Sequence, residues 1–177
     1  TKYIQQMPSS DFKGDTLYLR LHSEQGFRVF SPFYVPTLDP LDRFECRFGL
    51  GYTRILSEFQ GLQTDFTIFI PLGEKRELRD IRIMNNSSEP LEVDVIPLVE
   101  YTHPDALKQF TNADWVPQTM QSRAYRGESG TMILTQCAFM RLGTAVNYFT
   151  SNHRVSSFES DRAKFLGDHE YGTWSNP

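Results

Sequence analysis

The sequence has 177 residues, which suits one domain that buries about two thirds of the surface it exposes when unfolded. Its net charge is −4 at pH 7 and its pI is near 5.6. Nucleic-acid-binding proteins need a basic face to neutralise phosphates, and here Lys and Arg are interleaved with Asp and Glu. No apolar run is long enough to cross a bilayer. We therefore expect neither a nucleic acid nor a membrane among the partners.

The N-terminal residues and the cysteines suggest the cellular compartment. Residues 1–6 contain no Met and no apolar signal-peptide core, which predicts an interior segment of a longer cytoplasmic chain. Cys46 and Cys137 are the two cysteines, and a disulfide between them is possible. Two free buried thiols are the preferred interpretation, because the cytoplasm is reducing.

Apolar and polar residues alternate over several short stretches, which is typical of half-buried β-strands. Turn residues separate these stretches about every 8–12 positions, as in β-sandwiches and barrels. The prediction is an all-β fold, a large antiparallel β-sandwich with a core of Phe, Leu, Ile and Val. The predicted strands are residues 17–21, 27–29, 64–70, 78–84, 91–95, 131–140 and 145–150.

Two features of this pattern concern connections. The strands at 78–84 and 91–95 flank the turn-rich residues 85–90, which predicts a hairpin. Residues 103–126 show no sustained alternation but contain large apolar side chains, so we expect a functional loop rather than disorder there. The tail, residues 157–177, is also expected to be irregular.

Metal centres and common hydrolase motifs are not indicated. The four histidines are scattered, without His-x-His or Cys-x-x-Cys spacing, and we expect no metal and no cofactor. The nucleophile motif G-x-S-x-G does not occur. Acidic residues are plentiful, so paired carboxylates for sugar chemistry stay open, but their spacing does not single out a pair.

Three groups of motifs occur in order along the chain. The first is Ser31–Pro36 with Phe44–Thr53, the second is Phe69–Leu72 with Ile81–Ser87 and Val99–Glu100, and the third is Phe158–Arg162 with Phe165–Gly167 and Asn176–Pro177. Together they resemble the N-terminal β-sandwich of glycoside hydrolase family 94 phosphorylases, the cellobiose and chitobiose phosphorylase group. Two positions depart from the family pattern, with Phe48 in place of a His and Tyr101 in place of a Trp.

The resemblance implies a supersandwich of the galactose-mutarotase type over residues 1–177, and a parent enzyme that cuts a β-linked glucoside with inorganic phosphate. The reaction inverts the anomeric centre, releases an α-sugar 1-phosphate and needs one carboxylic acid to assist the leaving sugar. In the family this Asp and the phosphate site lie in a following (α/α)6 barrel, expected beyond Pro177. No catalytic residue is therefore expected in this segment. The family also implies a homodimer.

The resemblance further implies an acceptor-binding role for the loop after Glu100. Residues 111–120, Thr-Asn-Ala-Asp-Trp-Val-Pro-Gln-Thr-Met, look most like the cellobionic acid phosphorylases, whose acceptor is gluconate. An open-chain acid needs amide and cationic donors at its carboxylate and hydroxyls. The candidate substrate-binding residues are Asn112, Trp115, Gln118, Gln121 and Arg123.

Other interpretations stay open. The parent could be a phosphorylase of cellobiose or another β-glucan oligosaccharide, an inverting (α/α)6 hydrolase, or a glycosidase in which this segment is a non-catalytic carbohydrate-binding or scaffold domain. No aromatic strip at period two supports the binding domain. Glu45 and Arg47 are expected to pair inside the sandwich, and Asp161 and Arg162 to form a structural pair. Gly49 and Gly51 are expected at a bulge or a close backbone approach.

Overall fold

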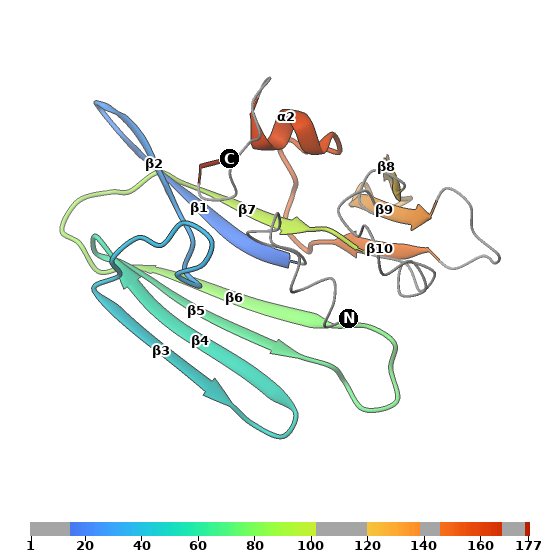
Figure 1. The fold of residues 1–177 in the computed structure, drawn as a ribbon, viewed down its shortest axis with the longest axis horizontal. Coiled ribbons are helices and arrows are strands. Elements are labelled where there is room, and N and C mark those ends of the chain that lie inside the picture. Colours follow the sequence, from blue (N-terminus) through green and yellow to red (C-terminus); the bar gives the residue numbers. More distant parts are fainter. Residues whose placement is uncertain (1–14, 102–119, 139–145, 168–175) are drawn as a thin grey trace, which may run out of the picture. The chain divides into compact units, whose positions relative to one another are not determined.

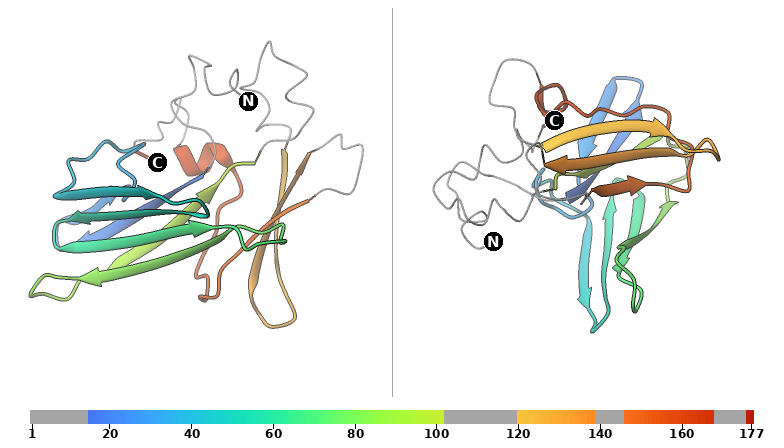
Figure 2. Two further views of the ribbon diagram at one scale, coloured as in Figure 1. Left: turned by 90° about the horizontal axis from the view of Figure 1, so that it is seen from below. Right: turned by 90° about the vertical axis from the view of Figure 1, so that its right-hand side faces the viewer.

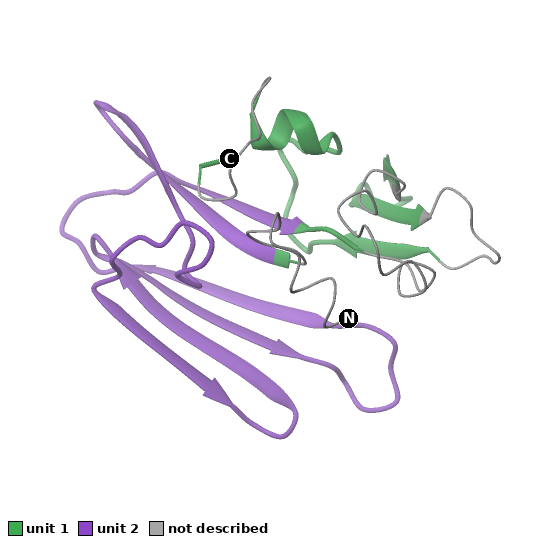
Figure 3. Cartoon of the chain, in the orientation of Figure 1, with its two compact units in different colours: residues 1–15, 99–177 green, residues 16–98 purple. Residues whose placement is uncertain are grey.

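The computed structural model describes residues 15–101, 120–138, 146–167 and 176–177. These residues fall into two compact units (Figure 3). One is Thr16–Leu98, and the other contains Asp15 and the described residues from Val99 to Pro177. Strands dominate both units (Figure 1), which confirms the all-β prediction. The elements are β1 (Asp15–Ser23), β2 (Gly26–Phe30), β3 (Arg43–Phe48), β4 (Tyr52–Phe59), β5 (Leu62–Phe69), β6 (Leu78–Asn85), β7 (Val93–Val99), β8 (Met120–Arg126), β9 (Met132–Ala138), β10 (Asn147–Thr150) and the short helix α2 (Arg162–Leu166).

The unit Thr16–Leu98 is a β-sandwich. One sheet has the strand order β2-β1-β7 and the other β3-β4-β5-β6, and Figure 2 shows them from two further sides. Alternate residues of each strand point between the sheets, because side chains alternate along a strand. The core residues from the first sheet are Leu17, Leu19 and Phe30, and those from the second are Phe59, Leu62 and Phe66. Burying each such side chain contributes about 1.5–3 kcal/mol.

The predicted hairpin of residues 78–95 is wrong. β6 pairs with β5, whereas β7 lies beside β1 in the other sheet, so residues 86–92 cross between the sheets. Asn85 organises this crossing, since its side chain accepts from the Ser87 backbone and donates to the Glu89 carbonyl. Both strands present apolar residues to one core, Ile81 and Ile83 from β6 and Val93 from β7. The alternation of apolar and polar residues is the same in a hairpin and in two strands that belong to different sheets, so the pattern cannot distinguish them.

Two further strands, β3 and β4, were not predicted as strands, and they form an antiparallel hairpin in the larger sheet. The prediction of an irregular segment at 103–126 is wrong for its last seven residues, which form β8. The tail also contains the unpredicted helix α2, where the Asp161 carboxylate caps the helix by accepting from the Ala163 backbone at 2.9 Å.

The second unit contains the antiparallel sheet β10-β9-β8. The Gln136 side chain of β9 donates to Ser122 on β8 and accepts from the Tyr101 backbone, at 2.9 Å each. The Arg162 guanidinium donates to the largely buried Glu100 carboxylate at 2.9 Å. Asp161 and Arg162 both have structural contacts, therefore, but with different partners.

The cysteines and the apolar segments bear on two of the expectations. Cys46 and Cys137 are free, as preferred, but both are half-buried rather than buried. Among the described residues, no helix has the length and apolar character needed to span a bilayer.

Candidate functional site

The candidate acceptor residues are only partly covered by the described structure. Asn112, Trp115 and Gln118 lie outside the described residues. Gln121 and Arg123 both lie on β8, and both are exposed. Because they are two positions apart on a strand, their side chains leave the same face of the sheet.

That face continues across all three strands. Arg123 is paired with Thr135 on β9, and Thr135 is paired with Tyr148 on β10. Directly paired residues of antiparallel strands share a face, with about 5 Å between their Cβ atoms. Tyr125 lies two positions after Arg123 and shares the face as well. Tyr125 is 46% exposed and Tyr148 63% exposed.

We define Gln121, Arg123, Tyr125, Thr135 and Tyr148 as the β8–β10 face. Arg and Gln side chains donate to carboxylate and hydroxyl oxygens. Tyrosines offer an apolar ring face together with a hydroxyl. The combination is chemically suited to a polar, ring-shaped or open-chain sugar. Tyr125 and Tyr148 were missed by sequence reasoning because they come from different strands, and period two along one strand cannot detect such a pair.

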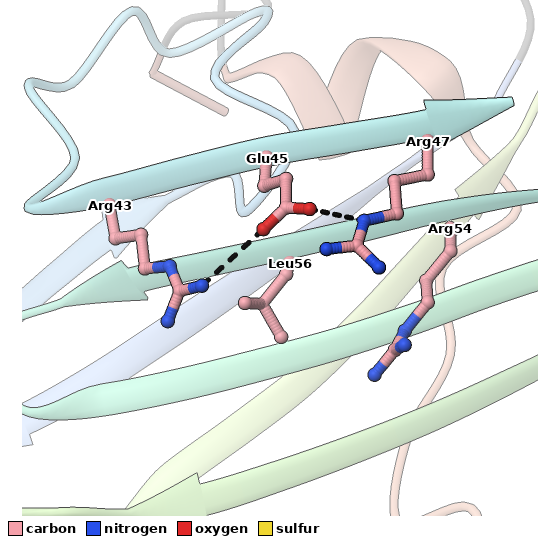
Figure 4. A pocket seen from close by; sticks show the side chains of 5 residues that line it. All are labelled: Arg43, Glu45, Arg47, Arg54 and Leu56. Carbon is pink, nitrogen blue, oxygen red and sulfur yellow. Dashed lines mark hydrogen bonds and ion pairs between the residues drawn. The ribbon is translucent and has the colours of Figure 1, made fainter.

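A second group of polar side chains lies on the exposed side of the larger sheet in the other unit. Arg43, Glu45, Arg47, Arg54 and Leu56 surround a shallow hollow of about 170 Å³ (Figure 4). The Glu45 carboxylate accepts from Arg47 and, at 3.3 Å, from Arg43. Chiefly the hydrogen bond from Arg47 lowers the pKa of Glu45. The expected Glu45–Arg47 pair is confirmed, but its predicted place inside the sandwich is wrong, since Arg47 is exposed.

The neighbouring hollow on this sheet, about 270 Å³, is also lined by paired charges. Arg54 forms an ion pair with Asp65, and Arg82 with Asp80. Chiefly the hydrogen bond from Arg54 lowers the pKa of Asp65 and raises that of Arg54. These cations have carboxylate partners, so we interpret the surface as a set of structural ion pairs. Arg54 and Asp65 join β4 to β5, whereas the pairs of Glu45 and of Asp80 each lie within one strand. The alternation Arg43, Glu45, Arg47 along one strand was the signal for the pairs of Glu45.

The described residues provide no cluster of three or more His, Cys, Asp or Glu side chains that could hold a metal ion. His22, for example, bonds with Asp94 at 2.7 Å and forms no larger cluster of such groups. Gly49 does mark a close approach, as expected, because a Cβ there would overlap the Tyr52 ring. Gly51 does not, because a Cβ there would have no neighbour within 4 Å.

Comparisons with known proteins give relatives that are named as phosphorylases. N,N'-diacetylchitobiose phosphorylase of Vibrio furnissii is 29% identical over 165 residues, which cover 90% of this chain and 20% of the relative. Solabiose phosphorylase of Paenibacillus borealis is 28% identical over 94 residues, 53% of this chain and 12% of the relative. 3-O-beta-D-glucopyranosyl-beta-D-glucuronide phosphorylase of the same organism is 24% identical over 174 residues, 90% of this chain and 22% of the relative.

The matched segment is thus about a fifth or less of each relative's length. A comparison with protein families matches residues 1–177 to the domain described as "Glycosyl hydrolase 94, supersandwich domain". The two-sheet unit and the strand-rich second unit agree with that description. Because the match extends over all 177 residues, the chain belongs to the glycosyl hydrolase 94 supersandwich family.

Proposed function

We propose that the chain is the supersandwich segment of a longer inverting glycoside phosphorylase. The parent cleaves a β-linked disaccharide with inorganic phosphate, giving an α-sugar 1-phosphate and a free acceptor sugar. Membership of the family and the phosphorylase names of three relatives support this reaction. The catalytic Asp and the phosphate site belong to an (α/α)6 barrel outside residues 1–177. The parent is a cytoplasmic homodimer.

The role of this segment is to shape the acceptor side of the site. The observation that carries the proposal is the position of Gln121 and Arg123, exposed side by side on β8 immediately after the loop that resembles the family's acceptor loop. An arginine fork and an amide match a carboxylate with neighbouring hydroxyls. The acceptor proposed on this basis is gluconate, and the substrate is cellobionic acid.

One relative supports an acidic acceptor in particular. Its name, 3-O-beta-D-glucopyranosyl-beta-D-glucuronide phosphorylase, includes a sugar acid as one half of the substrate. The other relatives carry neutral sugars in their names, and they leave cellobiose or another β-glucan oligosaccharide as the alternative substrate.

The direct test is phosphate release by the parent enzyme from α-glucose 1-phosphate in the presence of gluconate, glucose or N-acetylglucosamine. Release with gluconate alone is the expected result. Release with glucose would transfer the protein to the cellobiose group, and release with none of the three would contradict the phosphorylase proposal for these substrates.

Variants of two arginines on β8 distinguish a loss of acceptor binding from a general loss of stability. Arg123→Gln removes the proposed carboxylate partner, so the KM for gluconate rises while the KM for α-glucose 1-phosphate stays unchanged. Arg126→Gln is the matched control, because Arg126 lies on the same strand and its odd spacing from Arg123 places it on the other face. Equal losses for both variants, or for both substrates, would contradict the assignment.

A second function is favoured by the exposed Tyr125 and Tyr148. They could stack on a bound oligosaccharide outside the active site, as in a carbohydrate-binding domain. Titration with cello-oligosaccharides distinguishes the two functions. In a binding domain, Tyr125→Ala and Tyr148→Ala weaken oligosaccharide binding, and α-glucose 1-phosphate with any acceptor releases no phosphate.

A further inference from the structure

Gln136 on β9 forms hydrogen bonds with two separate parts of the second unit. Its Nε2 donates to Ser122 Oγ on β8, and its Oε1 accepts from the backbone N–H of Tyr101, both at 2.9 Å. Tyr101 follows β7, and Ser122 lies early in β8, so the two residues flank the sequence that resembles the family's acceptor loop. One half-buried side chain therefore holds the chain on both sides of that sequence.

The two partners determine the orientation of the Gln136 amide. A backbone N–H can only donate, so the group beside Tyr101 is the amide oxygen, and the NH2 group is left for the Ser122 hydroxyl. Methionine has a similar length and provides neither group. Both hydrogen bonds therefore depend on the amide itself and not on the size of the side chain.

Gln136 contacts β8 directly behind the proposed acceptor residues. Ser122 lies between Gln121 and Arg123 on β8 and is directly paired with Gln136. Paired residues share a face of the sheet, so the side chains of Ser122 and Gln136 lie on one face and those of Gln121 and Arg123 on the other. Gln136 is thus outside the β8–β10 face, and any effect it has on a ligand there acts through β8.

β9 also holds the next residue of β8. Thr135 Oγ1 donates to the Arg123 carbonyl at 3.4 Å. Consecutive residues of β9 therefore bond to consecutive residues of β8, one from each face of the sheet. Donors on a backbone that is held in this way lose less conformational entropy when they bind a ligand.

The other end of the β8–β9 hairpin provides a contrast. There the hydroxyls of Ser129 and Thr131 lie 2.9 Å apart and are two residues apart in sequence. The bond between Gln136 and Tyr101 joins residues that are 35 positions apart. The first contact can order only its own turn, whereas the second holds the chain after β7 beside the sheet that contains Gln121 and Arg123.

We infer that Gln136 is a positioning residue for the acceptor side of the parent phosphorylase. Its amide holds Ser122 against the chain that follows β7, and thereby sets the directions in which Gln121 and Arg123 leave β8. The inference rests on the proposed function, in which Gln121 and Arg123 bind the acceptor.

Steady-state kinetics of the parent enzyme with α-glucose 1-phosphate and gluconate test the inference. In Gln136→Met the KM for gluconate is expected to rise about 3- to 10-fold, as for the loss of a hydrogen bond, while kcat and the KM for α-glucose 1-phosphate stay unchanged. Ser122→Ala is expected to raise the KM for gluconate by a smaller factor. Adding Ser122→Ala to Gln136→Met is expected to have no further effect, because the two residues act through one contact.

Thr131→Val is the matched control. It removes a hydroxyl contact of the same hairpin at the end away from Gln136, so it is expected to leave kcat and both KM values unchanged. Equal rises of both KM values in Gln136→Met would overturn the inference, because they would indicate a general structural loss. An unchanged KM for gluconate in that variant would overturn it as well.

Failure of the proposed function gives a different result. If the wild-type enzyme uses glucose or N-acetylglucosamine in place of gluconate, the gluconate assignment is refuted, and the same variants are compared with the acceptor that is used. A wild-type enzyme that releases no phosphate with any of the three refutes the proposed reaction. Hydrogen exchange then tests Gln136 without activity, since Gln136→Met is expected to accelerate exchange of the Tyr101 amide several-fold. Unchanged exchange there would overturn the inference.

Discussion

Arg54 on β4 and Asp65 on β5 form a two-pronged ion pair across neighbouring strands. The guanidinium Nε and Nη2 donate to the two carboxylate oxygens at 2.8 and 2.6 Å. The residues are not directly paired, since Arg54 is opposite Thr67 and Asp65 is opposite Leu56, so the pair spans the diagonal of the sheet. A diagonal contact of this kind favours one strand register over a slipped one.

Replacing Asp65 with Asn is expected to lower stability at neutral pH and to weaken its pH dependence. The pKa of Asp65 is lowered below its ordinary value of 3.8, chiefly by the hydrogen bond from Arg54. A lowered pKa means that the pair contributes stability above pH 3.8 and loses it as the pH falls through the folded-state pKa. Urea unfolding at pH 7 and pH 3 measures this. The difference between wild type and Asp65→Asn shrinks at pH 3, and an equal difference at both pH values would contradict the assignment.

The core can be tested at Phe66, which is buried and packs edge-on against Phe33 with 4.8 Å between ring centroids. Phe66→Ala is expected to cost about 3–5 kcal/mol, because it removes the buried ring and leaves a cavity. Phe48→Ala in the 177-residue chain, where Phe48 is exposed, is the control and is expected to change stability by less than about 0.5 kcal/mol. Thermal unfolding of both variants measures these changes in stability. Similar losses of stability for Phe66→Ala and Phe48→Ala would contradict the assignment of Phe66 to the core.

Where local alternation was regular, the sequence was sufficient to predict strands. β1 is an example, because Leu17, Leu19 and Leu21 alternate along it and all three are buried. β4 was missed because its pattern is mixed, with Leu56 on the polar face of the sheet and the buried Ser57 on the core face. Pairing partners were also inaccessible, because alternation reports which residues share a face and not which strand lies alongside.

The same limit applied to the candidate site. Gln121 and Arg123 share a face by local spacing alone, which any strand would give them. Tyr148 joins them only through the register of β9 with both of its neighbours, a non-local feature. The paired charges around Glu45 were recognisable by spacing, but their exposure depended on which side of β3 faced the core.

A buried hydroxyl offers a stabilising substitution. Thr64 on β5 is buried, and its Oγ1 has no hydrogen-bond partner among the described residues. Thr64→Val keeps the branched shape and removes the unsatisfied group, so it is expected to raise stability by about 1 kcal/mol. Thr16 is the matched control, since it is equally buried and its Oγ1 lies 3.5 Å from Ser31 Oγ.

Thr16→Val is therefore expected to lower stability, by about 0.5–1.5 kcal/mol, because it removes a partner of the Ser31 hydroxyl. Chemical denaturation of the two variants gives opposite signs if the hydrogen-bonding assignment is correct. Destabilisation by Thr64→Val would show that its hydroxyl is satisfied in solution.

The ion pair between Glu100 and Arg162 joins two of the sequence segments by which the chain resembles its family. Glu100 is largely buried and Arg162 is more exposed, so the carboxylate depends more strongly on the contact than the guanidinium does. Arg162→Met removes a charged donor from a buried carboxylate, which is expected to cost about 1–3 kcal/mol. Glu100→Gln retains an acceptor for Arg162 and removes the buried charge, so its cost is expected to be smaller.

Arg126→Met, at an exposed position on β8, is the control for loss of an arginine and is expected to be nearly neutral. Urea unfolding of the three variants ranks them, and a larger loss for Glu100→Gln than for Arg162→Met would show that the buried charge itself stabilises this unit.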